Sequence, residues 1–328
     1  MRKKVKCFLS VMTTSSKFPI FLHLQKIFSY AKISAVIKMK CNICPRQCGA
    51  DREKEKGYCG KPNEFVLARA GLHLWEEPPI SGKNGSGTVF FSGCNLGCVY
   101  CQNYEISHGN VGKAISTGRL TEIFDELISK GAHNINLVNP THYASALKKV
   151  LSEYKSRVPI VYNSSGYEKT ETLKALEGLV DIYLPDLKYI NGDKALRYSA
   201  AKDYFDFASK ALIEMKRQCP ENIYDSDGIM RKGMIVRHLI LPKNTNQSIE
   251  VLRWINENLG NDTAISLMAQ YTPYGKIESY PELQRKITQR EYDKVLSFAV
   301  DLGFTNIFTQ EPSSASENFI PDFDLSGV

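Results

Sequence analysis

The sequence lacks any run of 18 or more uncharged apolar residues, so no segment has the length and apolarity of a transmembrane helix. It also lacks a basic stripe interleaved with aromatic residues, which a broad nucleic-acid-binding surface would need. The formal net charge is +7, but residues 1–38 contain eight Lys or Arg and no Asp or Glu, so the rest of the chain carries −1. We therefore expect a protein that binds neither membranes nor nucleic acid.

The first 38 residues have no segment typical of secretion. Their apolar stretch CFLSVM is too short for a signal peptide. The lack of acidic residues is typical of a transit peptide, although the segment contains a single arginine. Alternatively, translation starts at Met39 and residues 1–38 are not part of the native protein. Both interpretations stay open, this basic leader is left out of the fold prediction, and we expect a cytoplasmic location.

From Gly87 onward, short apolar runs rich in Ile, Val and Leu alternate with longer segments of helical periodicity. The runs are 87–93, 134–140, 159–165, 181–188, 234–241, 264–273 and 305–310. Such near-continuous hydrophobicity is typical of parallel strands buried on both faces. Between two of the runs, Asn246 and Ser248 are candidate caps for a helix that ends at Gly260. The alternation predicts a parallel sheet with right-handed crossovers.

Polar residues gather at the ends of these runs, which favours a barrel over an open sheet because the carboxyl ends of barrel strands form its working face. The polar residues are Asn139, Thr141, His142, Asn163, Ser165, Asp186, Lys188, Arg237, His238 and Gln270. Asp186 and Lys188 are as consistent with a local surface or lining pair as with an acid–base pair. We predict an α/β fold, a partial (β/α)6 TIM-like barrel with a small Cys-rich N-terminal extension. The extension is assigned to 39–86, the barrel to 87–311 and a C-terminal tail to 312–328.

Seven of the nine cysteines fall in two groups, which indicates metal or redox chemistry rather than a disulfide framework. One group, Cys94, Cys98 and Cys101, has the spacing C-x3-C-x2-C directly after the first predicted strand. A structural zinc site normally has four ligands, and this group lacks a fourth. Three thiolates on one short loop are typical of an iron–sulfur cluster in which one iron is left open for another ligand.

This motif, with an aromatic residue before its last cysteine, resembles the signature of the radical S-adenosylmethionine (SAM) superfamily. Over about residues 40–311, the chain is similar to pyruvate formate-lyase activating enzyme-like (PflX-type) proteins. The similar segments are CNICPRQCGADREKEKGYCG, GCNLGCVYCQNYEIS, NLVNPTHY, YNSSGYE, YLPDLKY, RHLILPKN and QYTPY. The alternative is a zinc knuckle or three incidental thiols.

The resemblance implies a [4Fe-4S] cluster held by the three cysteines and SAM bound to its open iron. It also implies which side chains contact SAM, although NPTH lacks the acidic residue of the usual Gly-Gly-Glu motif. These are Tyr100 near the adenine, Asn139, Thr141 and His142 at the amino group, Asn163 and Ser165 at the ribose, and Arg237 and His238 at a carboxylate. For Arg237 and His238, a local role in the barrel wall is the alternative.

The implied reaction is reductive cleavage of SAM to methionine and a 5′-deoxyadenosyl radical, which abstracts a hydrogen atom. Its partners would be a low-potential electron donor, flavodoxin or ferredoxin, and a glycyl radical enzyme whose backbone glycine is the target. Modification of another protein or of a small molecule is an alternative. A non-catalytic iron–sulfur or zinc protein is a further alternative from a different class.

The second group of cysteines precedes the predicted barrel. Cys41, Cys44, Cys48 and Cys59 have the spacing C-x2-C-x3-C-x10-C, and four thiols suffice for a closed metal site. A structural zinc ion and an auxiliary iron–sulfur cluster both fit this group, and we expect one of the two.

Overall fold

The computed structural model describes residues 40–311, 315 and 321–328, so the basic leader lies outside the described residues. The strands are β1 (Phe65–His73), β2 (Ser86–Phe91), β3 (Lys113–Ile115), β4 (Ile135–Val138), β5 (Ile160–Ser164), β6 (Ile182–Pro185), β7 (Ile223–Tyr224), β8 (Met230–Leu239), β9 (Ala264–Met268) and β10 (Ile307–Thr309). The helices are α2 (Pro78–Ser81), α3 (Tyr104–Ser107), α4 (Thr117–Ser129), α5 (Ala144–Glu153), α6 (Thr170–Lys174), α7 (Gly192–Ser199), α8 (Tyr204–Gln218), α9 (Thr245–Leu259) and α10 (Gln289–Asp301). Short 3₁₀ turns cover Thr141–Tyr143 and Pro281–Leu283.

The strands form one curved sheet in the order β10-β9-β8-β6-β5-β4-β2-β1-β3, with β7 attached to β8. Every neighbouring pair from β10 to β2 is parallel. All seven predicted apolar runs are strands in this parallel series. The predicted α/β partial TIM-like barrel is therefore confirmed.

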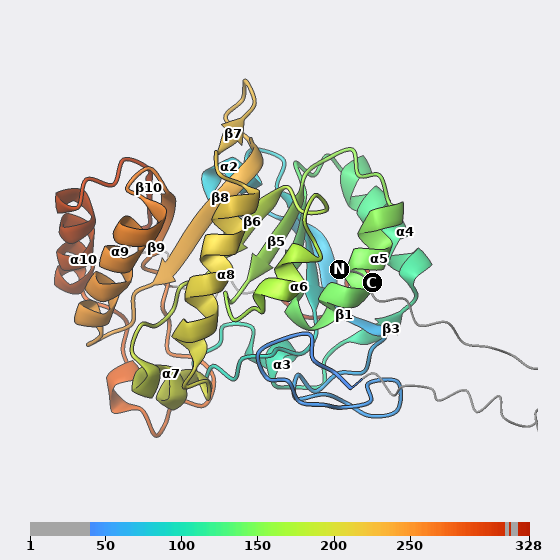
Figure 1. The fold of residues 1–328 in the computed structure, drawn as a ribbon, viewed down its shortest axis with the longest axis horizontal. Helices are drawn as coiled ribbons and strands as arrows, with labels where there is room; N and C mark the ends of the chain where they lie inside the picture. The colour runs from blue at the N-terminus through green and yellow to red at the C-terminus, as the bar shows by residue number, and fades with distance from the viewer. Residues whose placement is uncertain (1–39, 312–314, 316–320) are drawn as a thin grey trace, which may run out of the picture. The chain divides into compact units, whose positions relative to one another are not determined.

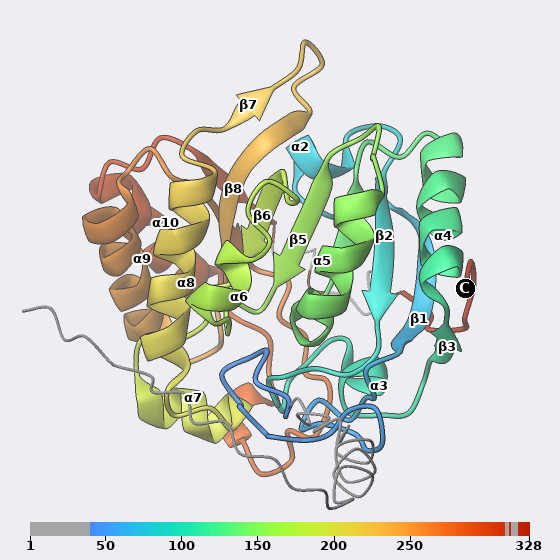
Figure 2. The same ribbon diagram turned by 45° about the vertical axis from the view of Figure 1, so that its right-hand side comes forward.

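Helices cover the outer face of the sheet, and the carboxyl ends of the strands point to one end of the molecule (Figures 1 and 2). All residues of β2, β5, β6 and β9 are buried. A strand with no exposed side chain must be covered on both faces, which explains why these runs lack polar–apolar alternation. The side chains on the enclosed inner face of the sheet can therefore line a cavity.

Two further strands extend the sheet beyond β2. β1 is antiparallel to β2 over Leu67–His73, and β3 is antiparallel to β1. β1 lies within the range assigned to the Cys-rich extension, yet it belongs to the same sheet as the barrel strands. Past Leu67, the edge of β1 is bonded by the tail: Leu325 N donates to Ala68 O at 3.1 Å and Ala70 N to Ser326 O at 2.9 Å.

The helix α9 begins one residue earlier than its predicted caps. Its first residue is Thr245, and Asn244 occupies the cap position without a side-chain cap bond. Asn246 and Ser248 therefore lie inside the first turn, and the capping prediction is wrong. The predicted end is confirmed, because Gly260 follows the last helical residue with a φ of 88°. In the described part of the chain, no helix is long and apolar enough to cross a membrane.

Candidate active site

The three cysteines of the C-x3-C-x2-C motif lie on the loop that follows β2. Backbone bonds hold this loop from two sides: Gly93 N donates to Ile106 O at 2.7 Å, and Val99 N to Tyr198 O at 2.9 Å. Gly93 has a φ of +87°, a conformation that favours glycine. The loop is thus fixed between α3 and α7.

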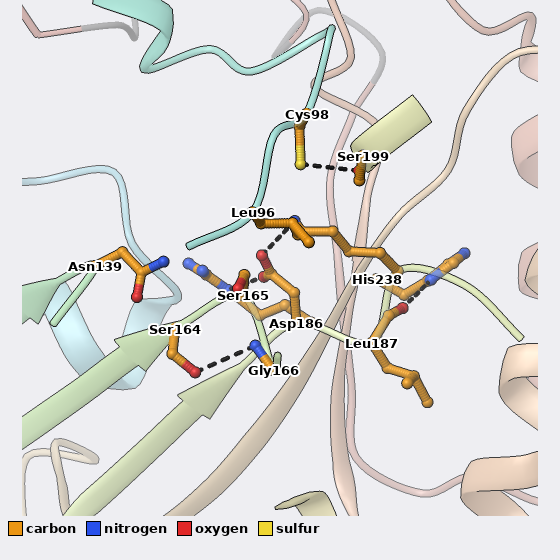
Figure 3. Close-up of polar contacts among 12 residues, drawn as sticks. Leu96, Cys98, Asn139, Ser164, Ser165, Gly166, Asp186, Leu187, Ser199 and His238 are labelled. Carbon is orange, nitrogen blue, oxygen red and sulfur yellow. Dashed lines mark hydrogen bonds and ion pairs between the residues drawn. The ribbon is translucent and has the colours of Figure 1, made fainter. Parts of the chain in front are cut away.

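Hydrogen bonds are donated to the sulfurs of Cys94 and Cys98. Leu96 N and Asn139 Nδ2 donate to Cys94 Sγ at 3.4 and 3.5 Å. The Ser199 hydroxyl donates to Cys98 Sγ at 3.0 Å, as Figure 3 shows. Hydrogen bonds to sulfur stabilise thiolate ligands and tune the potential of a cluster.

Burial raises the pKa of Cys94 to about 12 and that of Cys98 to about 11, and the thiols raise one another's pKa further. Burial also raises the pKa of Cys101. Thiols in such surroundings give up their protons when bound cations supply positive charge. Three sulfurs on one loop, of which Cys98 is buried and Cys94 and Cys101 are partly buried, therefore fit the ligand set of an iron–sulfur cluster. As placed, no three His, Cys, Asp or Glu side chains among the described residues converge on a single metal ion.

The thiols lie at a cavity of about 440 Å³ on the inner face of the sheet. Of the side chains predicted to contact SAM, five line it: Tyr100, Asn139, Asn163, Ser165 and Arg237. The Ser165 hydroxyl is buried, and nothing among the described residues bonds to it. A buried hydroxyl without a partner at a cavity wall fits a polar group of a bound ligand.

A network of charged side chains forms the inner wall of the cavity. Arg237 donates to Asp186 Oδ1 at 2.9 Å and to Asn163 Oδ1 at 2.6 Å, and its Nη1 lies 3.3 Å from Glu76 Oε2. Lys188 Nζ lies 2.5 Å from Asp186 Oδ2. Burial opposes ionisation of Asp186, but the two cations outweigh it and hold its pKa below the usual value. Buried charges are tolerated when they are paired in this way.

The strand β8 separates the two residues predicted at the carboxylate. Arg237 faces the cavity. His238 instead bonds to Leu187 O at 2.7 Å (Figure 3) and to Ser248 Oγ of α9 at 2.9 Å. Successive side chains of a strand point to opposite faces, so adjacent residues on β8 cannot both line the cavity. Burial lowers the pKa of His238 to about 4, so this imidazole is neutral.

Thr141 and His142 are also directed away from the cavity. The His142 ring bonds to Ser92 O at 2.8 Å, and the Thr141 hydroxyl bonds to Asn139 Oδ1 at 2.7 Å and to Glu168 Oε1 at 2.5 Å. Asn139 in turn bonds to Cys94 Sγ. Of the NPTH segment, only Asn139 lines the cavity. Thr141 lies on the side of Asn139 away from the cavity and bonds to its side chain.

A chain of hydrogen-bonded hydroxyl groups leads from Tyr100 through Tyr189 and Ser199 to Cys98. Tyr100 bonds to Tyr189 at 2.5 Å, and Tyr189 bonds to Ser199 at 2.8 Å between their hydroxyl oxygens. Because the Ser199 proton points at Cys98, Tyr189 must donate to Ser199 and Tyr100 to Tyr189. The ring of Tyr100 is thereby fixed against the cavity wall.

Asp186 and Lys188, expected to be a local surface or lining pair, both line the cavity. Two other site residues were not found from the sequence. Glu76 was missed because it follows β1, outside the predicted barrel, and Glu168 because its partners come from other strands. The adjacent acids in WEEPPI were the available signal for Glu76, and a weak one, because acidic residues are favoured near any helix start.

Comparison with known proteins agrees with this geometry. The sequence model of the Radical SAM superfamily matches residues 88–255. The protein MJ0674 of Methanocaldococcus jannaschii is 31% identical over 277 residues, which cover 82% of this chain and 76% of that protein.

Solved structures with a similar fold are more distant. SuiB of Streptococcus suis bound to the precursor peptide SuiA is 13% identical with a TM-score of 0.46, covering 66% of this chain and 46% of SuiB, so the chain spans about half of SuiB. A domain of pyruvate-formate lyase-activating enzyme from Bacteroides vulgatus is 10% identical with a TM-score of 0.37, covering 52% of this chain and 91% of that domain. The family match over residues 88–255 shows that this chain belongs to the radical SAM superfamily, whose cofactors are a [4Fe-4S] cluster and SAM.

Proposed function

We propose that the chain uses SAM to abstract a hydrogen atom from a backbone glycine of a partner protein, as an activase of a glycyl radical enzyme. Cys94, Cys98 and Cys101 would hold the cluster. When bound, the cluster and SAM supply one chemistry: an electron from the cluster breaks the C5′–S bond of SAM, giving methionine and a 5′-deoxyadenosyl radical that takes up a hydrogen atom.

The side chains of the cavity wall would bind and orient SAM. Asn139 and Ser165 offer polar atoms close to the cysteine loop, and Tyr100 offers an aromatic wall for the adenine. Thr141, His142 and His238 would act indirectly, because their side chains contact protein groups instead of the cavity. Lys188, whose pKa is raised by Asp186 against the effect of burial, is a cation that could meet the SAM carboxylate.

The observation that favours a macromolecular substrate is the size of the cavity. Pockets for drug-sized ligands span about 300–1,000 Å³. At about 440 Å³, this cavity lies near the lower end of that range. A cavity of this size can hold SAM, and the target hydrogen would then be presented at the cavity mouth by a segment of another chain. A glycine on an exposed loop of a partner meets this requirement, because it has no side chain to hinder close approach.

Radical SAM enzymes require a one-electron reductant, and we propose flavodoxin or ferredoxin as the donor. Burial of the cysteine loop favours the less charged, oxidised state of the cluster. A donor of low potential is therefore needed to reduce it.

The test is deuterium transfer. The chain is reconstituted anaerobically with iron and sulfide and incubated with SAM, dithionite and a glycyl radical enzyme labelled with α-dideuterated glycine. We expect 5′-deoxyadenosine containing one deuterium and a glycyl radical signal by electron paramagnetic resonance. A variant with Cys94, Cys98 and Cys101 all changed to Ala, and an unlabelled partner, are the controls.

The outcomes separate the levels of the proposal. Release of 5′-deoxyadenosine without deuterium would leave SAM cleavage intact and overturn the glycine target, in favour of another protein or a small molecule. No release of 5′-deoxyadenosine above that of the cysteine variant would overturn radical chemistry by this chain.

A further inference from the structure

The segment 40–63, which we call the cysteine lobe, has too little apolar material to be ordered by hydrophobic burial. It contains no helix or strand. Its buried apolar side chains are small, namely Cys44, Pro45, Ala50 and Cys59. Segments without a core of their own are usually ordered by disulfides or metals, and all four cysteines here are free thiols.

The turns of the lobe bring the four thiols to one place. Cys41 N donates to Ala50 O at 2.9 Å and Gly49 N to Cys41 O at 3.0 Å, which folds the first three cysteines into a hairpin. Gly57 brings the fourth close, since a Cβ at that position would lie 3.4 Å from Cys48 Sγ and 3.5 Å from Cys59 Sγ. A side chain at Gly57 would therefore occupy the space between two of the sulfurs.

Two buried cations face these thiols. Arg52 and Lys61 are each only 5% exposed, and neither forms an ion pair with a carboxylate among the described residues. Arg52 Cδ lies 3.4 Å from the same Gly57 position as the two sulfurs. Buried cations are costly unless an anion is close. Four thiolates around a metal would supply that anion, because a four-thiolate zinc or iron–sulfur centre carries net negative charge.

We propose that Cys41, Cys44, Cys48 and Cys59 bind one metal centre, and that this centre holds the radical SAM cysteine loop in position. The chemistry is thiolate ligation, of a zinc ion or of an iron–sulfur cluster. As they are placed, the thiols do not converge on a single ion, so binding would draw the hairpin and the Gly57 turn together.

The lobe touches the radical SAM loop directly. A Cβ at Gly93 would lie 2.5 Å from the carbonyl oxygen of Cys59, so the residue before Cys94 packs on one of the four lobe ligands. Movement of Cys59 would therefore displace the first cluster ligand. A loose lobe would leave the loop without this support.

Arg46, between Cys44 and Cys48, makes the second link. Its guanidinium donates to Asn95 O at 2.8 Å and to Ala200 O at 2.6 Å, and it lies 4.2 Å from the centre of the Tyr58 ring. It therefore joins the lobe to the radical SAM loop and to the end of α7 at once. Arg52 makes a third link by donating to His142 O behind the loop.

The first experiment measures metal content without radical chemistry. A variant with Cys94, Cys98 and Cys101 changed to Ala retains only the lobe thiols and Cys219 in the described chain. After anaerobic purification and reconstitution, we expect one centre per chain, either one zinc without sulfide or iron with equal acid-labile sulfide. Adding Cys41→Ala and Cys44→Ala should abolish it, whereas adding Cys219→Ala should not. The metal site would be overturned if the variant lacking Cys94, Cys98 and Cys101 held no more metal than the variant that also lacks Cys41 and Cys44.

The second experiment tests the link to the loop. Arg46→Met keeps all four lobe thiols but removes the bonds to Asn95 and Ala200. We expect faster amide hydrogen exchange in peptides covering 94–101, with unchanged exchange in α9 and α10 and unchanged lobe metal. Arg253→Met, an arginine on α9 that lies over Phe298, is the matched control. Wild-type exchange at 94–101 in Arg46→Met would overturn the link. Because this proposal rests on the radical SAM loop but not on turnover, either result leaves the deuterium-transfer test unaffected.

Discussion

The thiol of Cys94 is under the control of a residue that never touches it. Thr141 fixes Asn139, and Asn139 Nδ2 donates to Cys94 Sγ. If Glu168 is protonated, its proton satisfies the Thr141 oxygen, and the Thr141 proton is then directed at Asn139. Hydrogen bonds to ligand sulfurs stabilise the reduced cluster and raise its potential.

Thr141→Val should lower the reduction potential of the cluster, because Asn139 loses the partner that aims its amide at Cys94. We expect the ratio of reduced to oxidised cluster at a fixed potential to fall roughly three- to tenfold. This corresponds to a reduction potential that is lower by roughly 30–60 mV for a one-electron couple. Redox titration followed by electron paramagnetic resonance measures this shift. Thr88→Val removes another buried hydroxyl, one that bonds to Ser86 O, and is the control. Equal potentials in the Thr141 variant and the wild type would contradict the relay.

Glu168 should make stability depend on pH. Burial raises its pKa from 4.5 to about 8, although bonds from Thr141, Ser164 and Tyr162 oppose the shift. Between these two values the unfolded chain releases a proton that the folded chain keeps. The free energy of unfolding should therefore fall as pH rises from 4.5 to 8, by at most about 1.4 kcal/mol per unit, and level off above 8.

Glu168→Gln removes this titration and keeps a donor for Thr141. Urea midpoints measured at pH 5, 6.5 and 8 should decline less with pH in the variant than in the wild type. Parallel declines would mean that Glu168 is ionised in the folded protein.

At the scale of the element, β8 shows how a strand sorts adjacent residues. Arg237 is ion-paired with Glu76 and Asp186 at the cavity, and His238 bonds to Ser248 of α9. Replacing Arg237 by Gln and replacing His238 by Gln should therefore have different effects on SAM binding and stability. Arg237→Gln should weaken SAM binding at least tenfold and destabilise the chain by about 3–5 kcal/mol, because the largely buried Glu76 loses its cation and Asp186 keeps only Lys188.

His238→Gln should instead leave SAM affinity unchanged and lower stability by about 1–2 kcal/mol, since only two local bonds are lost. SAM titration of the cluster signal and urea unfolding separate the two effects. Weakened SAM binding in the His238 variant would contradict its placement behind the strand.

The elements show where prediction from the sequence succeeds and fails. The seven parallel strands were predictable because most of them are buried on both faces and therefore have near-continuous apolar sequences. β3 has three residues and β7 has two exposed ones, so neither leaves a periodic signal. The face on which a residue lies could not be predicted where two polar residues are adjacent, as at Arg237 and His238. That choice depends on the strand register, which is set by pairing across the sheet.

For the whole molecule, the cysteine spacing was enough to predict the cluster loop, because ligands for one cluster must be close in sequence when they share a loop. The rest of the site is assembled from distant segments. Glu76 meets Arg237 across 161 positions, and Asn139 meets Cys94 across 45. No local pattern specifies such pairs, and they come together only when the strands pair into the curved sheet.

The C-terminal tail, residues 321–328, packs beside the cavity and against β1. Pro321 lines the cavity, and Phe323 packs on Phe90 with ring centres 5.5 Å apart. The tail backbone bonds to β1 at Ala68 and Ala70, along the part of that strand that β3 leaves uncovered. Residues 321–328 therefore cover a free strand edge beside the cavity.

Deleting residues 321–328 should expose the cavity to solvent and to oxygen. We expect the reconstituted cluster to bleach several times faster in air-saturated buffer, and unfolding to require about 1.5–3 kcal/mol less, because the aromatic contact of Phe323 is lost. Absorbance of the cluster and urea unfolding measure the two effects. Asp324→Ala is the matched control: it keeps the tail but removes an exposed ion pair with Arg69 and the bond from Ser326 N to Asp324 Oδ1, which should change either quantity less than the deletion does. A truncated chain that bleaches at the wild-type rate would show that the tail covers the strand edge without protecting the cluster.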